Sequence, residues 1–283
     1  MNNKLLEKAF DPESFRSKGH QLADQLADLL GDSLNGKGKV TLAQSPDLLY
    51  EHWNNQTNQR ISTKDYFQKV IDQSINLHHP HYIGHQVSVP LPFGALATTL
   101  TSLLNNGMGI YEMGECATAI EKVVVDVFCK QVGYANGNGI LTSGGSLATL
   151  TALLSARARY QDIQIWEKGT HEQYCVLASD MAHYCVERAV RIMGWGAEGI
   201  IKVPVNDQYA MGTSRLSELY EASIEQGKKV IAIVGSAPCT ATGSYDNFKQ
   251  IAQFCEAYNI WFHIDGAHGG PAVFSEKYNV SVP

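Results

Sequence analysis

The stretch that most constrains the fold lies near the end of the chain, where the apolar run from Ile260 to Ile264 stops at Asp265 and small residues follow. A short apolar run rich in β-branched and aromatic residues indicates a buried strand. Open α/β sheets bind their ligands at the carboxyl ends of the strands, which is where Asp265 stands. Two interpretations remain from this stretch alone: Asp265 binds a ligand, or it caps the loop that follows.

The chain before this strand alternates between strand patterns and helical patterns. Short apolar runs predict buried strands at 140–142, 174–178, 200–205 and 230–234, and helical periodicity fills the intervals between them. This alternation predicts an α/β fold in which a mostly parallel sheet is covered by helices on both faces. It also predicts that the strand ending at Asp265 is a central member of the sheet.

The N-terminal part of the chain shows a different pattern. Residues 1–77 are polar and helical in periodicity, so we expect a helical N-terminal segment ahead of an α/β domain over 78–283. The apolar stripe of this segment packs either on its own domain or on a partner subunit, and the sequence does not choose between them. Two further helical patterns, at 93–106 and 120–128, carry regularly spaced aliphatic residues, and we expect both as core helices.

Composition narrows the classes of function. The chain has 22 basic and 28 acidic residues, a formal net charge of -6, and no block of Lys and Arg that would mark a nucleic-acid surface. It has no apolar stretch of the roughly 20 residues that a membrane helix needs, and no apolar signal-peptide core at its start. We therefore expect a cytoplasmic protein that acts on a small molecule, with neither nucleic acid nor membrane as partner. The six cysteines form no C-x-x-C pair, which predicts reduced core thiols and no metal site.

Polar residues follow three more of the predicted strands. The turn from Thr142 to Ser146 places two glycines ahead of a helix, where free N–H groups and the helix dipole favour an anion; a plain turn capped by Ser146 is the alternative. The turn matches neither a Walker loop nor a dinucleotide fingerprint, which disfavours ATP and NAD. His183 follows the next strand, either against a ligand or as a core histidine. The strand at 230–234 opens into small and hydroxyl residues that include Thr240, and we expect Asp246 to cap the helix that follows.

A loop ahead of the sheet concentrates four histidines in the eight positions from His78 to His85. No set of carboxylates or cysteines nearby completes a metal shell. We therefore expect a polar loop that lines a pocket rather than a metal centre.

Taken in chain order, these strand ends resemble those of one family. The stretches Thr142-Ser-Gly-Gly-Ser146, Ser179-Asp-Met-Ala-His183 and His263-Ile-Asp-Gly-Ala-His268 are similar to motifs of the group II pyridoxal-phosphate-dependent amino-acid decarboxylases, which include glutamate, aromatic-amino-acid and diaminobutyrate decarboxylases. The similarity runs from about His79 to the last residues. It implies an aminotransferase-like fold (PLP fold type I) with a three-layer α/β/α large domain. It also implies pyridoxal 5'-phosphate as cofactor, decarboxylation of a diaminobutyrate, acidic or aromatic L-amino acid, and a homodimer.

The resemblance also implies roles for single residues. The implied cofactor-binding residues are Ser143, Gly144, Gly145, Ser146, His183, Thr240, Asp265 and Ala267, and the implied substrate-binding residues are His85, Gln86 and Ser88. The glycine turn matches the phosphate site, His183 matches the residue that stacks on the cofactor ring, and Ala267 would touch the opposite ring face. Asp265 matches the carboxylate that keeps the pyridine nitrogen protonated, so that the ring accepts electrons from the substrate α-carbon. His183 and Asp265 are the implied catalytic residues.

The chain departs from the family in one respect. Family members attach the cofactor through a lysine that follows the aspartate in a segment containing Asp, His and Lys, whereas Lys277, the only lysine after Asp265, has a different context. We do not assign that role to Lys277. We therefore expect a chain that lacks the C-terminal part of the family, including its small domain, and that is inactive alone. Two alternatives remain: an incomplete PLP-fold fragment that binds cofactor or a partner subunit without turnover, and a nucleotide-binding α/β protein.

Overall fold

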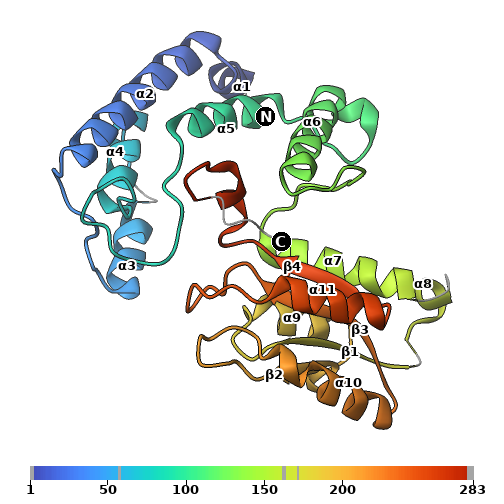
Figure 1. Ribbon diagram of the computed structural model, residues 1–283. Coiled ribbons are helices and arrows are strands. Elements are labelled where there is room, and N and C mark those ends of the chain that lie inside the picture. Colours follow the sequence, from blue (N-terminus) through green and yellow to red (C-terminus); the bar gives the residue numbers. More distant parts are fainter. Residues whose placement is uncertain (1–2, 57–58, 161–163, 171, 279–283) are drawn as a thin grey trace. The chain divides into compact units, whose positions relative to one another are not determined.

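The computed structural model describes residues 3–56, 59–160, 164–170 and 172–278, and it divides into two compact units, Met1–Asn106 and Gly107–Pro283 (Figure 1). The division expected between residues 77 and 78 falls inside the first unit, and that boundary stays a prediction. Among the described helices, no stretch combines the length and the apolarity that spanning a bilayer requires.

The described part of the first unit is built from helices. They are α1 (Asn3–Ala9), α2 (Pro12–Leu34), α3 (Pro46–Gln56), α4 (Thr63–Gln73) and α5 (Pro92–Leu104). Helix α2 begins where the Asp11 carboxylate accepts the N–H groups of Glu13 and Ser14. Helix α4 begins where the Ser62 hydroxyl accepts the N–H of Asp65. Both starts use a side-chain oxygen to satisfy N–H groups that have no partner inside the helix.

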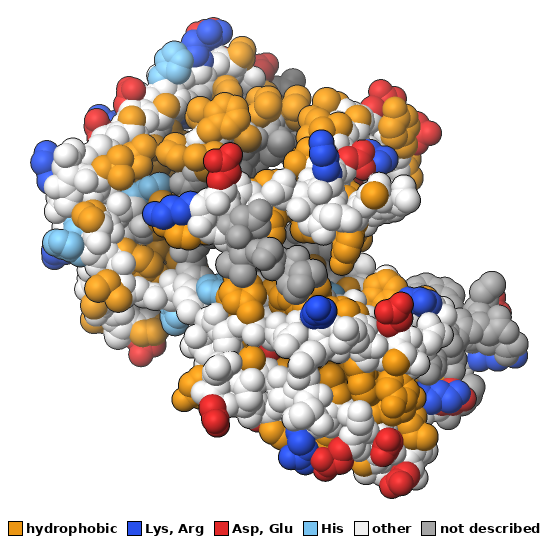
Figure 2. Space-filling view, in the orientation of Figure 1, with side chains coloured by type: hydrophobic (Ala, Val, Ile, Leu, Met, Phe, Trp, Pro, Cys, Tyr) orange, Lys and Arg blue, Asp and Glu red, His pale blue; other side chains and the backbone are white. Residues whose placement is uncertain are grey.

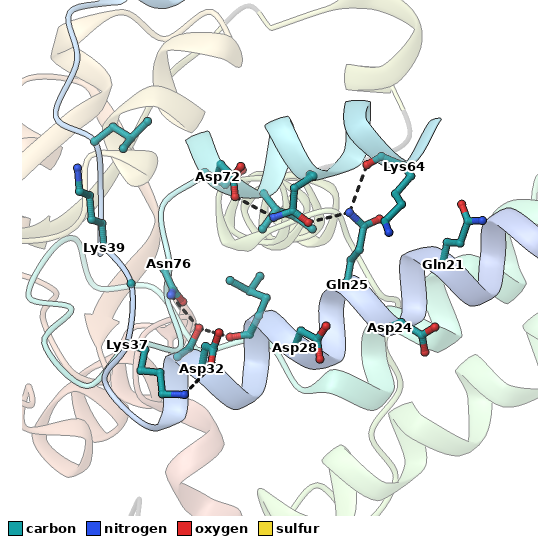
Figure 3. Close-up of a pocket in the computed structure, with 17 residues that line it drawn as sticks. Gln21, Asp24, Gln25, Asp28, Asp32, Lys37, Lys39, Lys64, Asp72 and Asn76 are labelled. Carbon is teal, nitrogen blue, oxygen red and sulfur yellow. Dashed lines mark hydrogen bonds and ion pairs between the residues drawn. The ribbon is translucent and has the colours of Figure 1, made fainter. Parts of the chain in front are cut away.

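A polar cavity of about 610 Å³ lies between α2 and α4 (Figure 3). The buried Gln25 of α2 bridges the two helices, because its Nε2 donates to the Lys64 carbonyl at 3.2 Å and to Gln68 Oε1 at 2.7 Å. The charged residues that line the cavity are Asp24, Asp28, Asp32, Asp72, Lys37, Lys39 and Lys64. None of the residues expected to bind cofactor or substrate lines this cavity.

The second unit is organised around a parallel sheet. Within the described residues the sheet has four strands in the order β2-β1-β3-β4. The strands are β1 (Gln173–Ser179), β2 (Ile200–Val203), β3 (Lys228–Ser236) and β4 (Trp261–Asp265). The helices are α6 (Glu115–Gln131), α7 (Gly145–Tyr160), α8 (Gln164–Lys168), α9 (Cys185–Ile192), α10 (Leu216–Glu225) and α11 (Phe248–Ala257). Short 3-10 turns occupy Tyr111–Met113, Ala197–Gly199, Thr213–Arg215 and Gly270–Phe274.

Helices cover both faces of this sheet, as Figure 1 shows. Successive side chains of a strand point to opposite faces, so β1 sends Val176 to one side and Leu177 to the other. Val176 joins a buried cluster with α7 and α9, whereas Leu177 joins a second cluster with α10 and α11. Each fully buried aliphatic side chain of this kind stabilises the fold by roughly 2 kcal/mol. The prediction of a three-layer α/β/α domain with a mostly parallel sheet is confirmed.

Two predictions about the strands were wrong. Residues 140–142 form no strand, and Ile140 and Leu141 are 64% and 59% exposed. A strand needs a neighbour to pair its backbone groups, and the Leu141 N–H donates instead to the side chain of Glu121 at 2.8 Å. Strand β4 therefore lies at the edge of the described sheet rather than at its centre, with β3 on one side and no described strand on the other.

The prediction that 93–106 and 120–128 form core helices was right about the helices and wrong about their burial. On α5, Leu96 and Leu100 are 64% and 59% exposed, and on α6, Ile120 and Val123 are 57% and 62% exposed. Apolar side chains gather on the surface over α5 (Figure 2). Helical periodicity defines an apolar face, but the element that covers the face is set by tertiary packing.

The prediction for the cysteines was also right for some residues and wrong for others. All six are free, and Cys175, Cys185, Cys239 and Cys255 are buried, as predicted for core thiols. The prediction was wrong for Cys116, which is exposed near the start of α6, and Cys129 is half-buried. Burial raises the pKa of Cys175 to about 11 and that of Cys255 to about 12, so both are protonated thiols at neutral pH.

Candidate active site

A cavity of about 230 Å³ lies where β1, β3 and β4 end. It is lined by Gly145, Ser146, His183, Cys185, Ser236, Pro238, Cys239, Thr240, Asp265, Ala267 and His268. Parallel strands deliver their carboxyl ends to one edge, and the pairing of β3 with β4 sets Ser236 beside Asp265. The volume is below the roughly 300 Å³ at the lower end of drug-sized pockets, which suits a small molecule.

The glycine turn forms one wall of the cavity. Helix α7 begins at Gly145, so Ser146 lies inside its first turn and the interpretation of Ser146 as the N-cap is not supported. Among the described residues, the N–H groups of Gly145 and Ser146 have no acceptor. A Cβ added at Gly145 would lie 2.8 Å from Ala267 Cβ, so the absence of a side chain lets the turn approach the loop after β4. The turn thus offers free N–H donors at the positive end of a helix dipole.

Asp265 ends β4 and has contacts on both oxygens. Its Oδ1 accepts the N–H of Ala267 at 3.1 Å, and its Oδ2 lies 3.8 Å from the Sγ of Cys185. Its backbone carbonyl accepts the N–H of Ala237 at 2.8 Å. The structure therefore combines the two interpretations of the sequence, because Asp265 caps the following turn and also lines the cavity.

His183 lies in the turn between β1 and α9 and lines the same cavity. Its Nδ1 accepts the N–H of Cys185 at 3.3 Å, and its ring lies 4.1 Å from that of Tyr184, measured between centroids. Since Nδ1 is the acceptor, Nε2 carries the proton of the neutral ring. These contacts restrain the ring at the cavity wall.

Thr240 lies in the loop after β3, which Asp246 anchors. The buried Asp246 accepts the N–H of Met211 at 2.6 Å and that of Ser236 at 2.7 Å. Burial raises the pKa of Asp246, and the two N–H donors oppose that rise. The sequence predicts Asp246 as the cap of the next helix, and this is wrong: Asn247 caps α11 by accepting the N–H of Gln250. Both Asp246 and Asn247 have side chains that can cap a helix. Asp246 does not cap α11, because its carboxylate accepts the buried N–H groups of Met211 and Ser236 instead.

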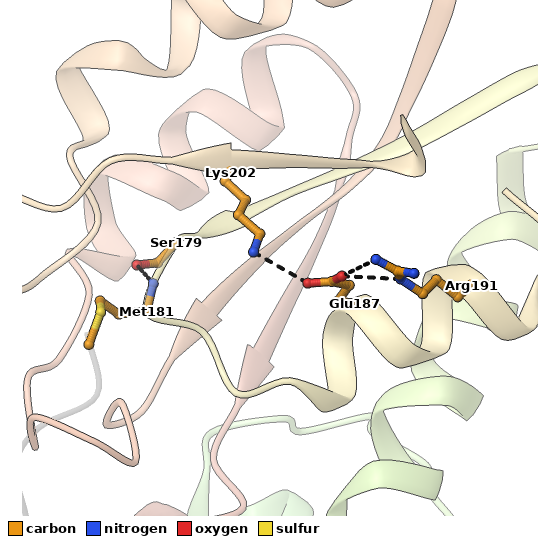
Figure 4. A network of polar contacts seen from close by, with 5 residues as sticks. All are labelled: Ser179, Met181, Glu187, Arg191 and Lys202. Carbon is orange, nitrogen blue, oxygen red and sulfur yellow. Dashed lines mark hydrogen bonds and ion pairs between the residues drawn. The ribbon is translucent and has the colours of Figure 1, made fainter. Parts of the chain in front are cut away.

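The turn that carries His183 is also supported by a polar network on α9 and β2 (Figure 4). Glu187 of α9 pairs with Arg191 at 2.5 Å and with Lys202 of β2 at 3.3 Å. The hydrogen bond from Arg191, then the bond and charge of Lys202, lower the pKa of Glu187. At the start of the turn, the Ser179 hydroxyl accepts the N–H of Met181 at 3.1 Å. These contacts tie α9 to the sheet next to the site.

Several predicted site residues are not on the cavity wall. Ser143 and Gly144 directly precede the lining turn, and His85, Gln86 and Ser88 belong to the first unit, so their roles stay predictions. Within the described part of the chain, no lysine lines the cavity, and the Lys277 ammonium lies 4.9 Å from the ring of Tyr278.

Sequence reasoning missed five of the lining residues. They are Cys185, Ser236, Pro238, Cys239 and His268. Each lies within two residues of a predicted site residue or within the loop that follows the strand at 230–234. Closeness in sequence to those predictions was the signal that could have found them.

Comparison with known proteins identifies the family. Residues 50–282 match the pyridoxal-dependent decarboxylase conserved domain. The chain belongs to this family. It is 29% identical over 227 residues to an L-aspartate decarboxylase of Metarhizium robertsii, covering 79% of this chain and 45% of the relative. It is 26% identical over 224 residues to an L-2,4-diaminobutyrate decarboxylase of Acinetobacter baumannii, covering 74% and 44%. The chain thus spans less than half the length of these relatives.

Solved structures confirm the fold. The glutamate decarboxylase domain of a diaminobutyrate-pyruvate transaminase and L-2,4-diaminobutyrate decarboxylase from Vibrio parahaemolyticus superposes with a TM-score of 0.84 at 24% identity, covering 93% of this chain and 60% of that one. Mouse CSAD in its apo form superposes with a TM-score of 0.86 at 22% identity, covering 94% and 58%. At these identities the likeness establishes the aminotransferase-like fold of the decarboxylases and nothing finer.

Proposed function

We propose that the protein binds pyridoxal 5'-phosphate and serves in the decarboxylation of an L-amino acid. One observation carries the proposal: residues that lie at or just after three strand ends or begin helix α7, and that the resemblance assigns to cofactor binding, line a single cavity. These residues are Gly145, Ser146, His183, Thr240, Asp265 and Ala267. The family match supports the same chemistry.

The chemistry of the cavity wall fits this cofactor. The unpaired N–H groups of Gly145 and Ser146 at the start of α7 suit a phosphate, which carries the negative charge that a helix N-terminus favours. The Asp265 carboxylate suits a protonated ring nitrogen. The His183 ring and the small side chain of Ala267 suit the two faces of a flat ring. A charged end, a polar edge and two flat faces are the recognition elements that pyridoxal phosphate requires.

In this proposal the chain's residues position the cofactor and keep one proton on its ring nitrogen. The cofactor, when bound, supplies a ring that accepts the electrons left on the substrate α-carbon as CO2 departs. Asp265 keeps a proton on the ring nitrogen, so that the ring stays electron-poor. His183 fixes the plane of the ring, and Ala267 leaves the opposite face free of a colliding side chain. Thr240 lies on the cavity wall, and Gly145 and Ser146 anchor the phosphate.

The substrate belongs to the L-amino acids that are diamino, acidic or aromatic. The relatives named above act on L-aspartate and L-2,4-diaminobutyrate, according to their names. We propose that His85, Gln86 and Ser88 approach the substrate, as the resemblance implies. A single pocket side chain changes preference between such amino acids, so the class rather than one member is proposed.

The test combines binding with turnover. Pyridoxal phosphate added to the purified 283-residue chain should quench tryptophan fluorescence saturably, and Asp265→Asn should weaken this binding. The complete gene product should release CO2 from L-aspartate, L-glutamate, L-2,4-diaminobutyrate or an aromatic amino acid, and Asp265→Asn should abolish release. Asp207→Asn, in an exposed turn, is the matched control. If no amino acid releases CO2, or if Asp265→Asn is as active as the control, the proposal is wrong.

A second candidate is cofactor binding without turnover by this chain. The supporting observation is that no lysine lines the cavity among the described residues. This candidate is favoured if the 283-residue chain binds pyridoxal phosphate saturably but releases no CO2, while the complete gene product does release CO2. CO2 release by the chain itself would contradict it.

We further propose a cytoplasmic homodimer. The exposed leucines of α5 and the exposed aliphatic residues of α6 are faces of the kind that mark protein interfaces. Light scattering behind a sizing column should give twice the chain mass, and Leu96→Glu with Leu100→Glu should shift it to the monomer. A monomer at micromolar concentration would contradict the proposal. Cell fractionation tests whether the protein is cytoplasmic.

A further inference from the structure

We propose that Cys185 is a positioning residue for the site, orienting the Asp265 carboxylate through its thiol and the His183 ring through its backbone N–H. This inference rests on the proposed function. It concerns a residue that was not among the predicted site residues and that links both implied catalytic side chains.

The thiol of Cys185 has two polar neighbours. Its Sγ lies 3.8 Å from Asp265 Oδ2 and 3.6 Å from Thr149 Oγ1, within the longer range of hydrogen bonds that involve sulfur. Cys185 and Thr149 are only 3% and 2% exposed, so water does not compete at the sulfur. A thiol has a single proton, and a carboxylate is a stronger acceptor than a hydroxyl. The S–H group therefore donates to Asp265, and the Thr149 hydroxyl is left to support the sulfur.

The protonation state agrees with this direction. Burial, as the main cause, raises the pKa of Cys185, and the neighbouring Asp265 carboxylate raises it further, while Thr149 opposes the rise. The sulfur is thus a thiol at neutral pH and can donate.

The contact completes a set of restraints on Asp265. Its Oδ1 is fixed by the N–H of Ala267 at 3.1 Å, so the thiol restrains the second oxygen from the α9 side. With one donor on each oxygen, the carboxylate plane cannot rotate freely about the side chain. A carboxylate with a defined plane is what recognition of a ring N–H requires, because the remaining lone pairs then face one direction.

The same residue restrains His183. The N–H of Cys185 donates to His183 Nδ1 at 3.3 Å, at the first residue of α9. One helix start therefore contacts the stacking ring through its backbone and the carboxylate through its side chain. The competing explanation is that Cys185 only fills the core cluster with α7 and α9, to which it also belongs.

A first experiment needs no cofactor. The Cβ chemical shift of Cys185 reports ionisation of the thiol without requiring access by a reagent. It is followed by NMR from pH 7 to pH 11, in the 283-residue chain and in its Asp265→Asn variant. Losing the carboxylate should lower the pKa of Cys185, so that its thiol ionises at lower pH in the variant. The Cβ shift of the buried Cys255, whose pKa burial alone raises, is the internal control and should be the same in both proteins over this range. An unchanged pH dependence of the Cys185 shift overturns the proposal.

A second experiment separates positioning from packing. Pyridoxal phosphate affinity and the position of its absorbance band are measured for Cys185→Ala, Cys185→Ser and the control Cys255→Ala. We expect Cys185→Ala to weaken binding roughly 3- to 10-fold, the range of one lost hydrogen bond, and Cys185→Ser to restore it because a hydroxyl also donates. Equal binding by Cys185→Ala and wild type overturns the positioning role alone. Absence of binding by wild type overturns the proposed function, and the positioning role with it.

Discussion

The buried carboxylate of Asp246 accepts the backbone N–H of Ser236 at 2.7 Å, which fastens the loop after β3 to the strand that precedes it. The same carboxylate accepts the N–H of Met211. Asp246→Ala leaves both N–H groups buried and unpaired, so we expect the free energy of unfolding to fall by about 3 kcal/mol. Asp246→Asn keeps one acceptor oxygen and should cost less. Urea unfolding measures both, and the exposed Asp207→Ala should stay within about 0.5 kcal/mol of wild type. Equal stability of Asp246→Ala and Asp207→Ala would contradict the anchor.

The approach of Gly145 to Ala267 provides a steric test. A Cβ at position 145 would meet the Ala267 methyl at 2.8 Å, whereas a Cβ at Gly144 would meet nothing within 4 Å. We expect Gly145→Ala to lower the free energy of unfolding by about 1 to 3 kcal/mol through overpacking, and Gly144→Ala to change it little. Ala267→Gly in the Gly145→Ala background removes the clash and should restore most of the loss. Thermal or urea unfolding of these four proteins decides the matter, and a loss of the same size at both glycines would refute the contact.

His263 of β4 should make stability depend on pH. Its Nε2 is buried without a partner among the described residues, and burial lowers its pKa below 6.5, against the weaker opposing charge of Asp265. The unfolded chain therefore binds the proton more readily than the folded chain, so stability is full above about pH 6.5 and is lost as pH falls below it. Each unit of pKa difference is worth about 1.4 kcal/mol.

The measurement is urea unfolding between pH 8 and pH 5. His263→Leu should flatten the pH dependence in that window, while His20→Gln, at an exposed position on α2, should leave the wild-type curve unchanged. If His263→Leu retains the full wild-type slope, the buried imidazole is not its source.

The bridge from Glu187 to Lys202 should respond to salt. Both side chains are at the surface, so their attraction is screened at high ionic strength. We expect Glu187→Gln to lower the midpoint of urea unfolding slightly in low salt and to match wild type in 1 M NaCl. Because the pKa of Glu187 is lowered in the fold, its contribution is present above the unfolded pKa and disappears as pH falls through the folded one. A salt-independent difference would point to lost packing instead.

Local patterns in the sequence were sufficient to predict much of the fold and part of the candidate site. The run ending at Asp265 predicted a strand whose carboxyl end carries a polar residue, and β4 ends at that residue. Strand-end residues are separated by long helical stretches in the chain, yet parallel pairing brings His183, Thr240 and Asp265 to one cavity. This convergence was predictable because the carboxyl ends of parallel strands share an edge.

Other features depended on contacts that local patterns do not contain. The apolar run at 140–142 has the composition of a strand, but no described strand pairs with it. Helices α5 and α6 have the periodicity of core helices, but their apolar faces are exposed. Composition and period describe one element at a time, whereas pairing and burial require a second element.

The sequence by itself therefore determined the layers of the fold, the family and the strand ends that carry polar residues, because hydrophobic periodicity and short motifs are local properties. Only the tertiary structure decided that Asp246 anchors a loop instead of capping a helix, that β4 lies at an edge of the described sheet, and that Cys185 contacts both His183 and Asp265. Those relationships join residues far apart in the chain, and long-range packing rather than local preference sets which of them meet.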